Sequence, residues 1–248
     1  MNLILSTLKK EKSLSLKKIM SLTNVSRDTA RRDIVTLTEN NLVRRTYGGI
    51  AQLDSFKELD SFLTRSSHKS REKFLLAKEA SKLIAEDDLV YLDVSTTVSL
   101  VPQNLPEHLN NLIVTNSIDI ANQLLTYSNC HCRLLGGNLD KKKRCVVGTK
   151  PLRELDDYLI DLAVIGVVGI DEKGVYYAYE EDIEMKRKIR LQSKKIALLV
   201  DSTKIGEAHK FRVFNFDEID AILVTAELPG SLLRRMKEHH VEIIQVAN

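Results

Sequence analysis

In the first 55 residues, apolar side chains recur every three or four positions, which is the spacing of short amphipathic helices. The pattern predicts helices over residues 2–10, 15–22 and 26–40, with a turn-like stretch at 23–25. Residues 42–53 form two strand-like pieces around adjacent glycines, which favours a tight turn. Short helices followed by such a hairpin predict a winged helix-turn-helix.

Beyond residue 70 the pattern changes to alternating helix-like and strand-like segments. Several strand candidates are continuous apolar runs, as strands buried on both faces of a parallel sheet require. The predicted strands are residues 89–94, 112–115, 132–135, 162–168, 195–200, 221–224 and 241–246. The predicted helices are residues 71–85, 117–126, 180–193 and 230–239. This alternation predicts an α/β domain with a mostly parallel sheet.

The two patterns divide the chain into a small domain over residues 1–55 and a larger α/β domain over residues 71–248. Residues 56–70 are polar and rich in serine, and we interpret them as a linker. Their sequence is compatible with either a helix or a flexible connection. A length of 248 residues suits two domains of ordinary size.

Composition narrows the class of protein. Hydrophobic residues make up 43% of the chain, which is enough for a packed core. No apolar run approaches the roughly 18 residues of a membrane helix, and the N-terminus lacks the order of a signal peptide. We therefore expect a cytoplasmic protein with no membrane contact.

An odd number of cysteines, three, argues against a disulfide framework. Cys130 and Cys132 flank His131 on a predicted strand, where His131 faces away from both thiols, so we expect no metal and no cofactor.

Charge is distributed unevenly along the chain. The net charge is +3, yet residues 1–57 hold eleven Lys and Arg against five Asp and Glu, a balance of +6. Residues 58–248 have a balance of −3. A basic head on a slightly acidic body indicates a polyanionic partner for the head, although a solvated basic surface would have the same composition.

The third helix of the head has the features of a DNA reader. Ser26 is a good N-cap, and Ala30, Ile34 and Leu37 form one apolar stripe. Arginines on the other faces suit guanine edges and phosphates, and the hairpin adds further basic groups. By itself, such a helix is also compatible with an ordinary amphipathic surface helix. The predicted DNA-contacting residues are Ser26, Arg27, Asp28, Thr29, Arg31, Arg32, Arg44, Arg45 and Tyr47.

Polar motifs follow the predicted strands of the body, at the sheet edge where parallel α/β proteins bind ligands. Hydroxyls of residues 95–97, together with the unpaired N–H groups of a helix that we expect to begin there, suit a phosphate. Lys73 and Lys204 would add positive charge, and Asp201 would accept hydrogen bonds from sugar hydroxyls. The alternative is that these are ordinary turn and cap residues.

These motifs resemble the DeoR family of bacterial regulators. Residues 25–34 read VSRDTARRDI and residues 45–50 read RTYGGI, which is similar to the family's N-terminal signature, with Ala30 where a larger aliphatic residue is usual. The resemblance continues through the body at residues 72–73, 93–97, 115–117, 135–137, 169–171, 184–187 and 201–204. It departs at Ser95, where the family usually has Gly, and at Ala226, where it often has an acidic residue.

The resemblance implies a sensor domain related in fold to ribose 5-phosphate isomerase and glucosamine-6-phosphate deaminase, with a phosphorylated sugar as ligand. The predicted effector-binding residues are Lys73, Asp93, Ser95, Thr96, Thr97, Thr115, Asn116, Gly136, Gly137, Glu184, Lys186, Asp201 and Lys204.

We therefore predict a sequence-specific regulator, a repressor of carbohydrate metabolism genes, that binds a double-stranded operator as a dimer or tetramer and has no catalytic residues. Two alternatives remain. The first is an isomerase or deaminase in which Asp93, Glu184, Asp201 or Lys204 moves protons. The second is an architectural DNA-binding protein with no small-molecule ligand.

Overall fold

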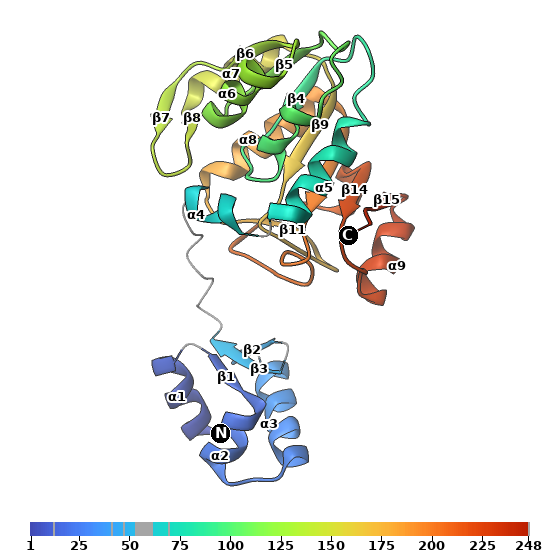
Figure 1. Cartoon of the computed structure of the whole chain (residues 1–248). Coiled ribbons are helices and arrows are strands. Elements are labelled where there is room, and N and C mark those ends of the chain that lie inside the picture. The colour runs from blue at the N-terminus through green and yellow to red at the C-terminus, as the bar shows by residue number, and fades with distance from the viewer. Residues whose placement is uncertain (12, 41, 47, 53–61, 69, 248) are drawn as a thin grey trace. The chain divides into compact units, whose positions relative to one another are not determined.

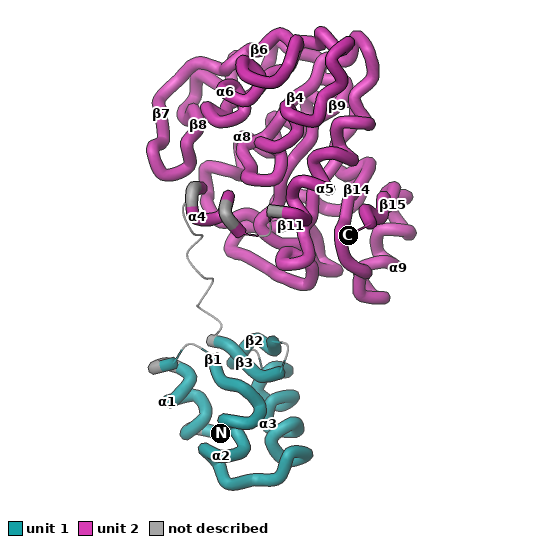
Figure 2. Tube along the Cα trace, viewed as in Figure 1, with its two compact units in different colours: residues 1–58 teal, residues 59–248 magenta. Residues whose placement is uncertain are grey.

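The computed structural model describes the chain except for residues 12, 41, 47, 53–61, 69 and 248. It separates into two compact units, Met1–Glu58 and Leu59–Asn248 (Figure 2). The unit boundary falls within a few residues of the predicted end of the head at residue 55. Each unit has its own hydrophobic core, and we describe each by itself.

The N-terminal unit is a winged helix-turn-helix. It contains α1 (Asn2–Glu11), α2 (Leu16–Thr23) and α3 (Arg27–Glu39), close to the predicted ranges. The predicted hairpin consists of β2 (Val43–Thr46) and β3 (Gly49–Gln52), and β3 also pairs with β1 (Ser13–Ser15), which we did not predict. The apolar stripe of α3 is buried as expected. The core comprises Ile4, Leu8, Leu14, Ile19, Ala30, Ile34, Leu37, Val43 and Ile50.

The two adjacent glycines of the hairpin are each required for a different structural reason. Gly48 has a φ of 90°, a conformation that side chains other than glycine disfavour. Gly49 lies against β1, where a Cβ atom would be 2.0 Å from the backbone oxygen of Leu14. Gly48 makes the turn, and Gly49 permits β1 to join the sheet as its third strand.

The C-terminal unit is built on a parallel sheet, whose described strands follow the order β15-β14-β12-β9-β4-β5-β6 (Figure 1). Every strand that the sequence predicted in this unit belongs to it. The strands are β4 (Val90–Leu92), β5 (Leu112–Thr115), β6 (His131–Leu134), β9 (Ile160–Gly166), β12 (Ser193–Val200), β14 (Ala221–Val224) and β15 (Glu242–Gln245). The chain runs outward from β4 through β5 to β6, returns to β9, and then runs outward in the other direction.

The central strands of this sheet are buried on both faces. Successive strand residues point to opposite sides of the sheet and therefore join opposite cores. Tyr91 packs in one core, whereas Val90 and Leu92 pack in the other. The first core is covered by α8 (Glu181–Gln192) and α9 (Gly230–Glu238), and the second by α5 (Ser70–Ser81) and α6 (Ile118–Tyr127). The fold class expected from the sequence is therefore confirmed.

Several smaller elements were not predicted. They include an antiparallel sheet of β10 (Gly169–Asp171), β11 (Gly174–Tyr177) and β13 (Phe211–Phe214), and a hairpin of β7 (Asn138–Asp140) and β8 (Cys145–Val147). Helix α7 (Thr149–Glu154) follows that hairpin, and α4 (Phe62–Ser67) lies inside the segment interpreted as a linker. The short 3₁₀ helices are η1 (Val98–Leu100), η2 (Pro102–Asn104), η3 (Leu155–Asp157) and η4 (Phe216–Glu218).

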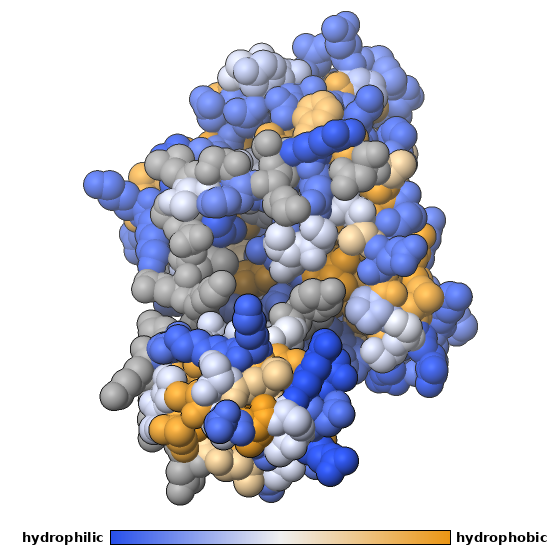
Figure 3. Space-filling view, turned by 60° about the horizontal axis from the view of Figure 1, so that its bottom comes forward, coloured by the Kyte–Doolittle hydropathy of each residue, from blue (hydrophilic) through white to orange (hydrophobic). Residues whose placement is uncertain are grey.

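On the face drawn in Figure 3, hydrophobic residues lie scattered among hydrophilic ones. Within the described ranges, none of the helices combines the length and the apolar character that crossing a membrane requires.

Candidate functional site

Helix α3 begins at the N-cap that its sequence predicts. The hydroxyl of Ser26 accepts a hydrogen bond from the backbone N–H of Thr29, at 3.3 Å. The same hydroxyl lies 2.9 Å from Oγ1 of Thr29. In the preceding turn, Asn24 adopts the left-handed conformation and ends α2. This local chemistry fixes where α3 starts and hence which side chains its first two turns present.

The predicted DNA-contacting residues of α3 lie at the surface. Arg27, Asp28, Thr29, Arg31 and Arg32 are exposed, while the apolar stripe of the same helix is buried. On β2, Arg45 is exposed and Arg44 is half-buried; Tyr47 lies outside the described residues. An exposed row of guanidinium groups on a rigid helix suits contacts to phosphates and to guanine edges in a major groove.

A cavity of about 790 Å³ opens at the carboxyl ends of β4 and β9. These neighbouring strands are where the strand order of the sheet reverses, which is the usual ligand position in open parallel sheets. Four predicted effector residues line the cavity: Ser95, Asn116, Glu184 and Lys186. Its apolar lining includes Val94, Val146, Val147, Leu152, Val167, Val168, Ile183 and Met185.

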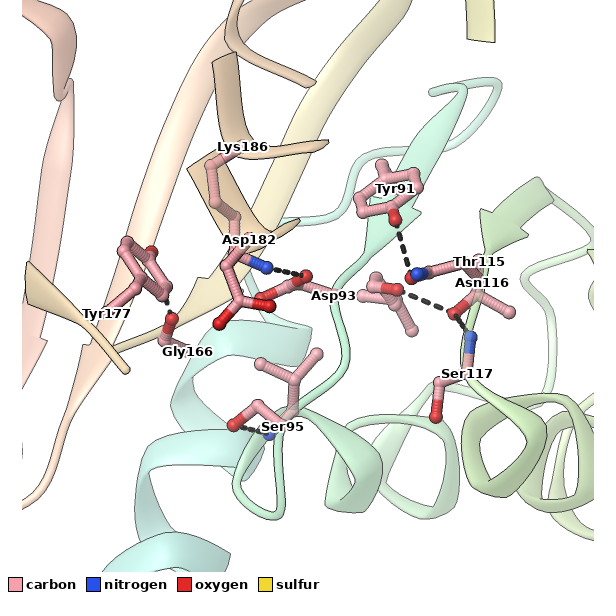
Figure 4. A network of polar contacts seen from close by, with 12 residues as sticks. Tyr91, Asp93, Ser95, Thr115, Asn116, Ser117, Gly166, Tyr177, Asp182 and Lys186 are labelled. Atoms are coloured by element: carbon pink, nitrogen blue, oxygen red, sulfur yellow. Dashed lines mark hydrogen bonds and ion pairs between the residues drawn. The ribbon is translucent and has the colours of Figure 1, made fainter. Parts of the chain in front are cut away.

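A buried ion pair lies at this cavity. The Lys186 ammonium donates to Oδ1 of Asp93 at 2.5 Å, and it also lies 5.2 Å from the centre of the Tyr177 ring (Figure 4). Among the described residues, Oδ2 of Asp93 has no hydrogen-bond partner. Burial raises the pKa of Asp93, Lys186 opposes this rise, and the carboxylate of Asp182 adds to it. The pair therefore offers a cation at the cavity wall and an unsatisfied acceptor behind it.

Asn116 and Thr115 have different positions at the end of β5. The Asn116 amide accepts from the Tyr91 hydroxyl at 2.8 Å, donates to the Val146 carbonyl at 3.1 Å, and lines the cavity (Figure 4). Thr115 is fully buried; its hydroxyl donates to the Leu92 carbonyl at 2.7 Å and accepts from the Ser117 N–H at 3.0 Å. Asn116 is thus presented to a ligand, whereas Thr115 ties the ends of β4 and β5 together.

The loop after β4 departs from expectation. We predicted that a helix beginning there would offer unpaired N–H groups, but the chain forms only the 3₁₀ helix η1. The Ser95 hydroxyl accepts from the N–H groups of Thr97 and Val98, at 3.1 and 3.4 Å, so these donors are already bonded. Ser95 fits because Gly166 has no side chain: a Cβ atom there would lie 2.2 Å from the Ser95 hydroxyl oxygen. Thr96 and Thr97 are buried and are not among the residues that line the cavity.

Lys73, Asp201 and Lys204 form a second group, and none of the three lines the cavity. Lys73 is buried and its ammonium donates to the Arg65 carbonyl, and Arg65 is one of the residues that line the cavity. Burial lowers the pKa of Lys73, Asp201 raises it, and Lys204 and Arg65 lower it further. Asp201 accepts from the Thr203 backbone N–H at 3.0 Å.

Glu72 is a buried residue to which sequence reasoning assigned no role. Its carboxylate accepts from the N–H and hydroxyl of Ser202, at 2.8 and 3.0 Å, and from the Thr225 hydroxyl at 2.8 Å. These bonds fasten α5 to the ends of β12 and β14. The pairing of Glu72 with Thr225 spans 153 residues, so no local pattern could have revealed it.

Gly136 and Gly137 lie beside the hairpin of β7 and β8. The Gly136 N–H donates to Glu154 at 2.8 Å, and Gly137 has a φ of 150° with Val146 close to the position of its missing Cβ atom. Neither lines the main cavity, although Gly137 borders a small hollow next to Gly148 and Thr149.

Lys143, on the hairpin between β7 and β8, was also missed. Its ammonium lies 4.2 Å from the centre of the Tyr179 ring and 3.3 Å from the carboxylates of Glu181 and Asp182. Burial lowers the pKa of Lys143, but Asp182 and Glu181 outweigh this effect and the pKa is raised. Because the hairpin itself was not predicted, no sequence signal placed Lys143 at the cavity, which it lines.

Among the described residues, no group of His, Cys, Asp and Glu side chains is arranged to hold a metal ion.

Two family models match the chain. The DeoR-like helix-turn-helix domain matches residues 1–56, and the DeoR C terminal sensor domain matches residues 68–226. The chain belongs to the DeoR family. This DeoR-family protein is a DNA-binding transcriptional regulator with a sensor domain, which confirms the function predicted from its sequence.

Three of its relatives are regulators, and each aligns with this chain over most of its own length. The HTH-type transcriptional repressor GlcR of Bacillus subtilis is 39% identical over 92% of this chain and 87% of its own. The glycerol-3-phosphate regulon repressor of Escherichia coli is 28% identical over 98% and 96%. The HTH-type transcriptional regulator IolR of B. subtilis is 30% identical over 93% and 92%. These names bear out the interpretation as a regulator and not an isomerase or deaminase.

Among solved structures, ribose 5-phosphate isomerase A of Methanocaldococcus jannaschii aligns with 54% of this chain and 54% of its own. The identity is 19% and the TM-score is 0.40.

Proposed function

We propose that this regulator is a repressor whose affinity for its operator is set by a phosphorylated sugar bound in the cavity at the carboxyl ends of β4 and β9. The observation that carries the proposal is the cavity at the point where the strand order reverses. Its volume of about 790 Å³ falls within the usual range for small-molecule sites. Its lining combines apolar side chains with polar and charged ones, which suits a sugar, whose rings have both apolar and hydroxyl-bearing faces.

We assign the sugar hydroxyls to the deep polar wall. Asn116 and Lys186 offer donors, and Glu184 offers an acceptor. Ser95 borders the same wall. The other predicted residues do not line the cavity: Lys73, Asp93, Thr96, Thr97, Thr115, Gly136, Gly137, Asp201 and Lys204.

The head supplies the operator contacts in this proposal. The exposed side chains of α3 and β2 bind one half-site, and a dimer or tetramer binds two, because two-fold operators mirror two-fold proteins. The protein works in the cytoplasm, where its operator lies. Its genes belong to carbohydrate metabolism, as the glycerol-3-phosphate regulon named for one relative suggests.

The test is fluorescence anisotropy of the full-length protein on DNA from upstream of its own gene. The titration is repeated at one fixed salt concentration with glycerol 3-phosphate, glucose 6-phosphate, fructose 1-phosphate and ribose 5-phosphate, each beside its unphosphorylated counterpart. We expect specific binding that one phosphate ester weakens and its counterpart leaves unchanged. Specific binding that ignores every ester would contradict the sensor half of the proposal.

A cavity-filling variant separates the cavity from the rest of the sensor. Val168→Phe places a ring at the cavity lining and is expected to abolish the response to the ester while operator binding persists. Leu159→Phe is the matched control, because Leu159 is 78% exposed and does not line the cavity. An unchanged response in Val168→Phe would place the ligand elsewhere.

A further inference from the structure

The cavity proposed to hold an anionic effector has an acidic wall. Four acidic residues among the described lining residues come from one stretch at the start of α8: Glu180, Glu181, Asp182 and Glu184. The three glutamates are exposed to solvent, whereas Asp182 is half-buried. A carboxylate without a compensating cation repels a phosphate, and the repulsion grows where solvent is excluded. Binding of an anion at this wall therefore requires that the charge of Asp182 is compensated.

Lys143 supplies this compensation from a different part of the chain. Its ammonium lies 3.3 Å from Oδ1 of Asp182 and 3.3 Å from Oε2 of Glu181. It also lies 4.2 Å from the centre of the Tyr179 ring, which is a favourable position for a cation. The Lys143 side chain is only 14% exposed and that of Asp182 23%, compared with 73% for Glu181. Because solvent screens the pair with Asp182 less, that pair is the stronger of the two.

The hairpin of β7 and β8 holds the Lys143 backbone in place. The Lys143 N–H donates to Oδ1 of Asp140 at 2.8 Å, which closes the turn between the two strands. The next residue, Arg144, donates through Nε to Asp119 at 2.8 Å, and its carbonyl accepts from the Ile118 N–H at 3.2 Å. These bonds tie the hairpin to the start of α6. Lys143 therefore reaches α8 from a base that is fixed to a different helix.

Asp182 also lies near the buried ion pair at the cavity. Its carboxylate is close enough to Asp93 to raise the pKa of that group, and Figure 4 shows both beside Lys186. The Lys186 ammonium is already hydrogen-bonded to Asp93. Without the charge of Lys143, Asp182 would compete for this ammonium with Asp93 and with any anionic ligand.

From these contacts we infer that Lys143 is a specificity-determining residue of the sensor. By neutralising Asp182 and Glu181, it allows the acidic start of α8 to form one wall of a cavity that binds an anionic ligand. The inference rests on the function proposed above. Lys143 acts through the two carboxylates, so this role requires no contact between its ammonium and the ligand.

The first experiment measures, by calorimetry, the Kd of the full-length protein for glycerol 3-phosphate, glucose 6-phosphate, fructose 1-phosphate and ribose 5-phosphate. For the ester that binds, Lys143→Met is expected to weaken binding about 10-fold, because one charge of the wall is no longer balanced. Lys143→Arg keeps the positive charge and should retain most of the affinity. Lys141→Met is the matched control, because Lys141 is an exposed lysine of the same hairpin and does not line the cavity.

The second experiment determines whether the effect acts through charge. Lys143→Met combined with Asp182→Asn removes both charges of the more buried pair, so the affinity for the ester should return close to the wild-type value. Salt should also reduce the ratio between the Kd of Lys143→Met and that of wild type, because it screens charges near the surface. Thermal unfolding checks that the sensor remains folded, and Lys143→Gln, which keeps a polar side chain, provides a second neutral variant.

The outcomes separate the role of Lys143 from the proposed function. Wild-type affinity for the ester in a folded neutral variant would overturn the inference while the proposed function stands. A loss that persists unchanged in the double variant, or that is the same at low and high salt, would assign the effect to packing and would also overturn the inference. Failure of the wild-type protein to bind any of the esters would contradict the proposed function and this inference together.

Discussion

The head and the sensor hold their candidate functional groups in opposite ways. In the head, the side chains assigned to DNA stand on the outer faces of α3 and β2, and all described ones except half-buried Arg44 are exposed. In the sensor, most assigned groups are buried, and several are bonded to residues far away in sequence. Lys186 and Asp93 are 93 residues apart, for example.

In the head, the residues assigned to binding therefore differ from those that stabilise the fold. In the sensor, many of the residues assigned to binding also stabilise the fold. An exposed arginine on a helix whose buried stripe is intact contributes to a partner interface but little to stability. A buried charge is tolerated only because its partner is present, so removing one member of a pair disturbs the fold as well as the site. Substitutions should therefore have distinct signatures in the two units.

The largest expected effect comes from the buried pair. Lys186→Met leaves the Asp93 carboxylate buried without its cation, and we expect the sensor to lose about 3–5 kcal/mol of unfolding free energy. Hydrogen exchange of the full-length protein in increasing urea reports this loss in peptides from the sensor. Peptides from the head are the internal control, because the head core consists of its own side chains.

A double variant tests whether the unpaired charge causes this loss of stability. Asp93→Asn combined with Lys186→Met removes both charges, so most of the lost stability should return. A double variant as unstable as the single one would mean that packing, and not the unpaired charge, causes the loss. An equal loss of stability in the head peptides would contradict the difference between the two units.

The head should show the opposite signature. Arg32→Ala is expected to cost about 1–3 kcal/mol of operator binding if the guanidinium reads a base, with no measurable change in hydrogen exchange of either unit. Anisotropy on operator and non-operator DNA at one salt concentration provides the measurement. An equal loss on both DNAs would instead assign Arg32 to a phosphate.

The parts of the fold that the sequence predicted are those governed by local periodicity. Several strands of the parallel sheet are continuous apolar runs, and the order in which strands and helices appear was enough to indicate the fold class. The antiparallel strands β10, β11 and β13 are only three or four residues long and contain polar positions such as Asp171 and Arg212. Their pairing is set by tertiary contacts, so local pattern could not reveal them.

The candidate site was predictable only in part, for a related reason. Motifs at strand ends led to Asn116 and Ser95, which line the cavity. They did not reveal that the Ser95 hydroxyl bonds the N–H groups assigned to a phosphate, because that depends on its rotamer against Gly166. Nor did they reveal Arg65 or Lys143, since α4 and the hairpin of β7 and β8 reach the cavity through the tertiary fold.

The smallest expected effects come from the N-cap hydrogen bonds of helices, which occur in both units. Ser26 caps α3 by accepting from the Thr29 N–H, and Ser117 caps α6 by accepting from the Ile120 N–H, each at 3.3 Å. Ser26 is exposed, whereas Ser117 is fully buried. Water can replace the first hydroxyl but not the second, so Ser26→Ala should cost about 0.5–1 kcal/mol and Ser117→Ala about 2 kcal/mol. Hydrogen exchange in urea measures both in their own units, and equal costs would show that burial does not set the difference between head and sensor at this scale.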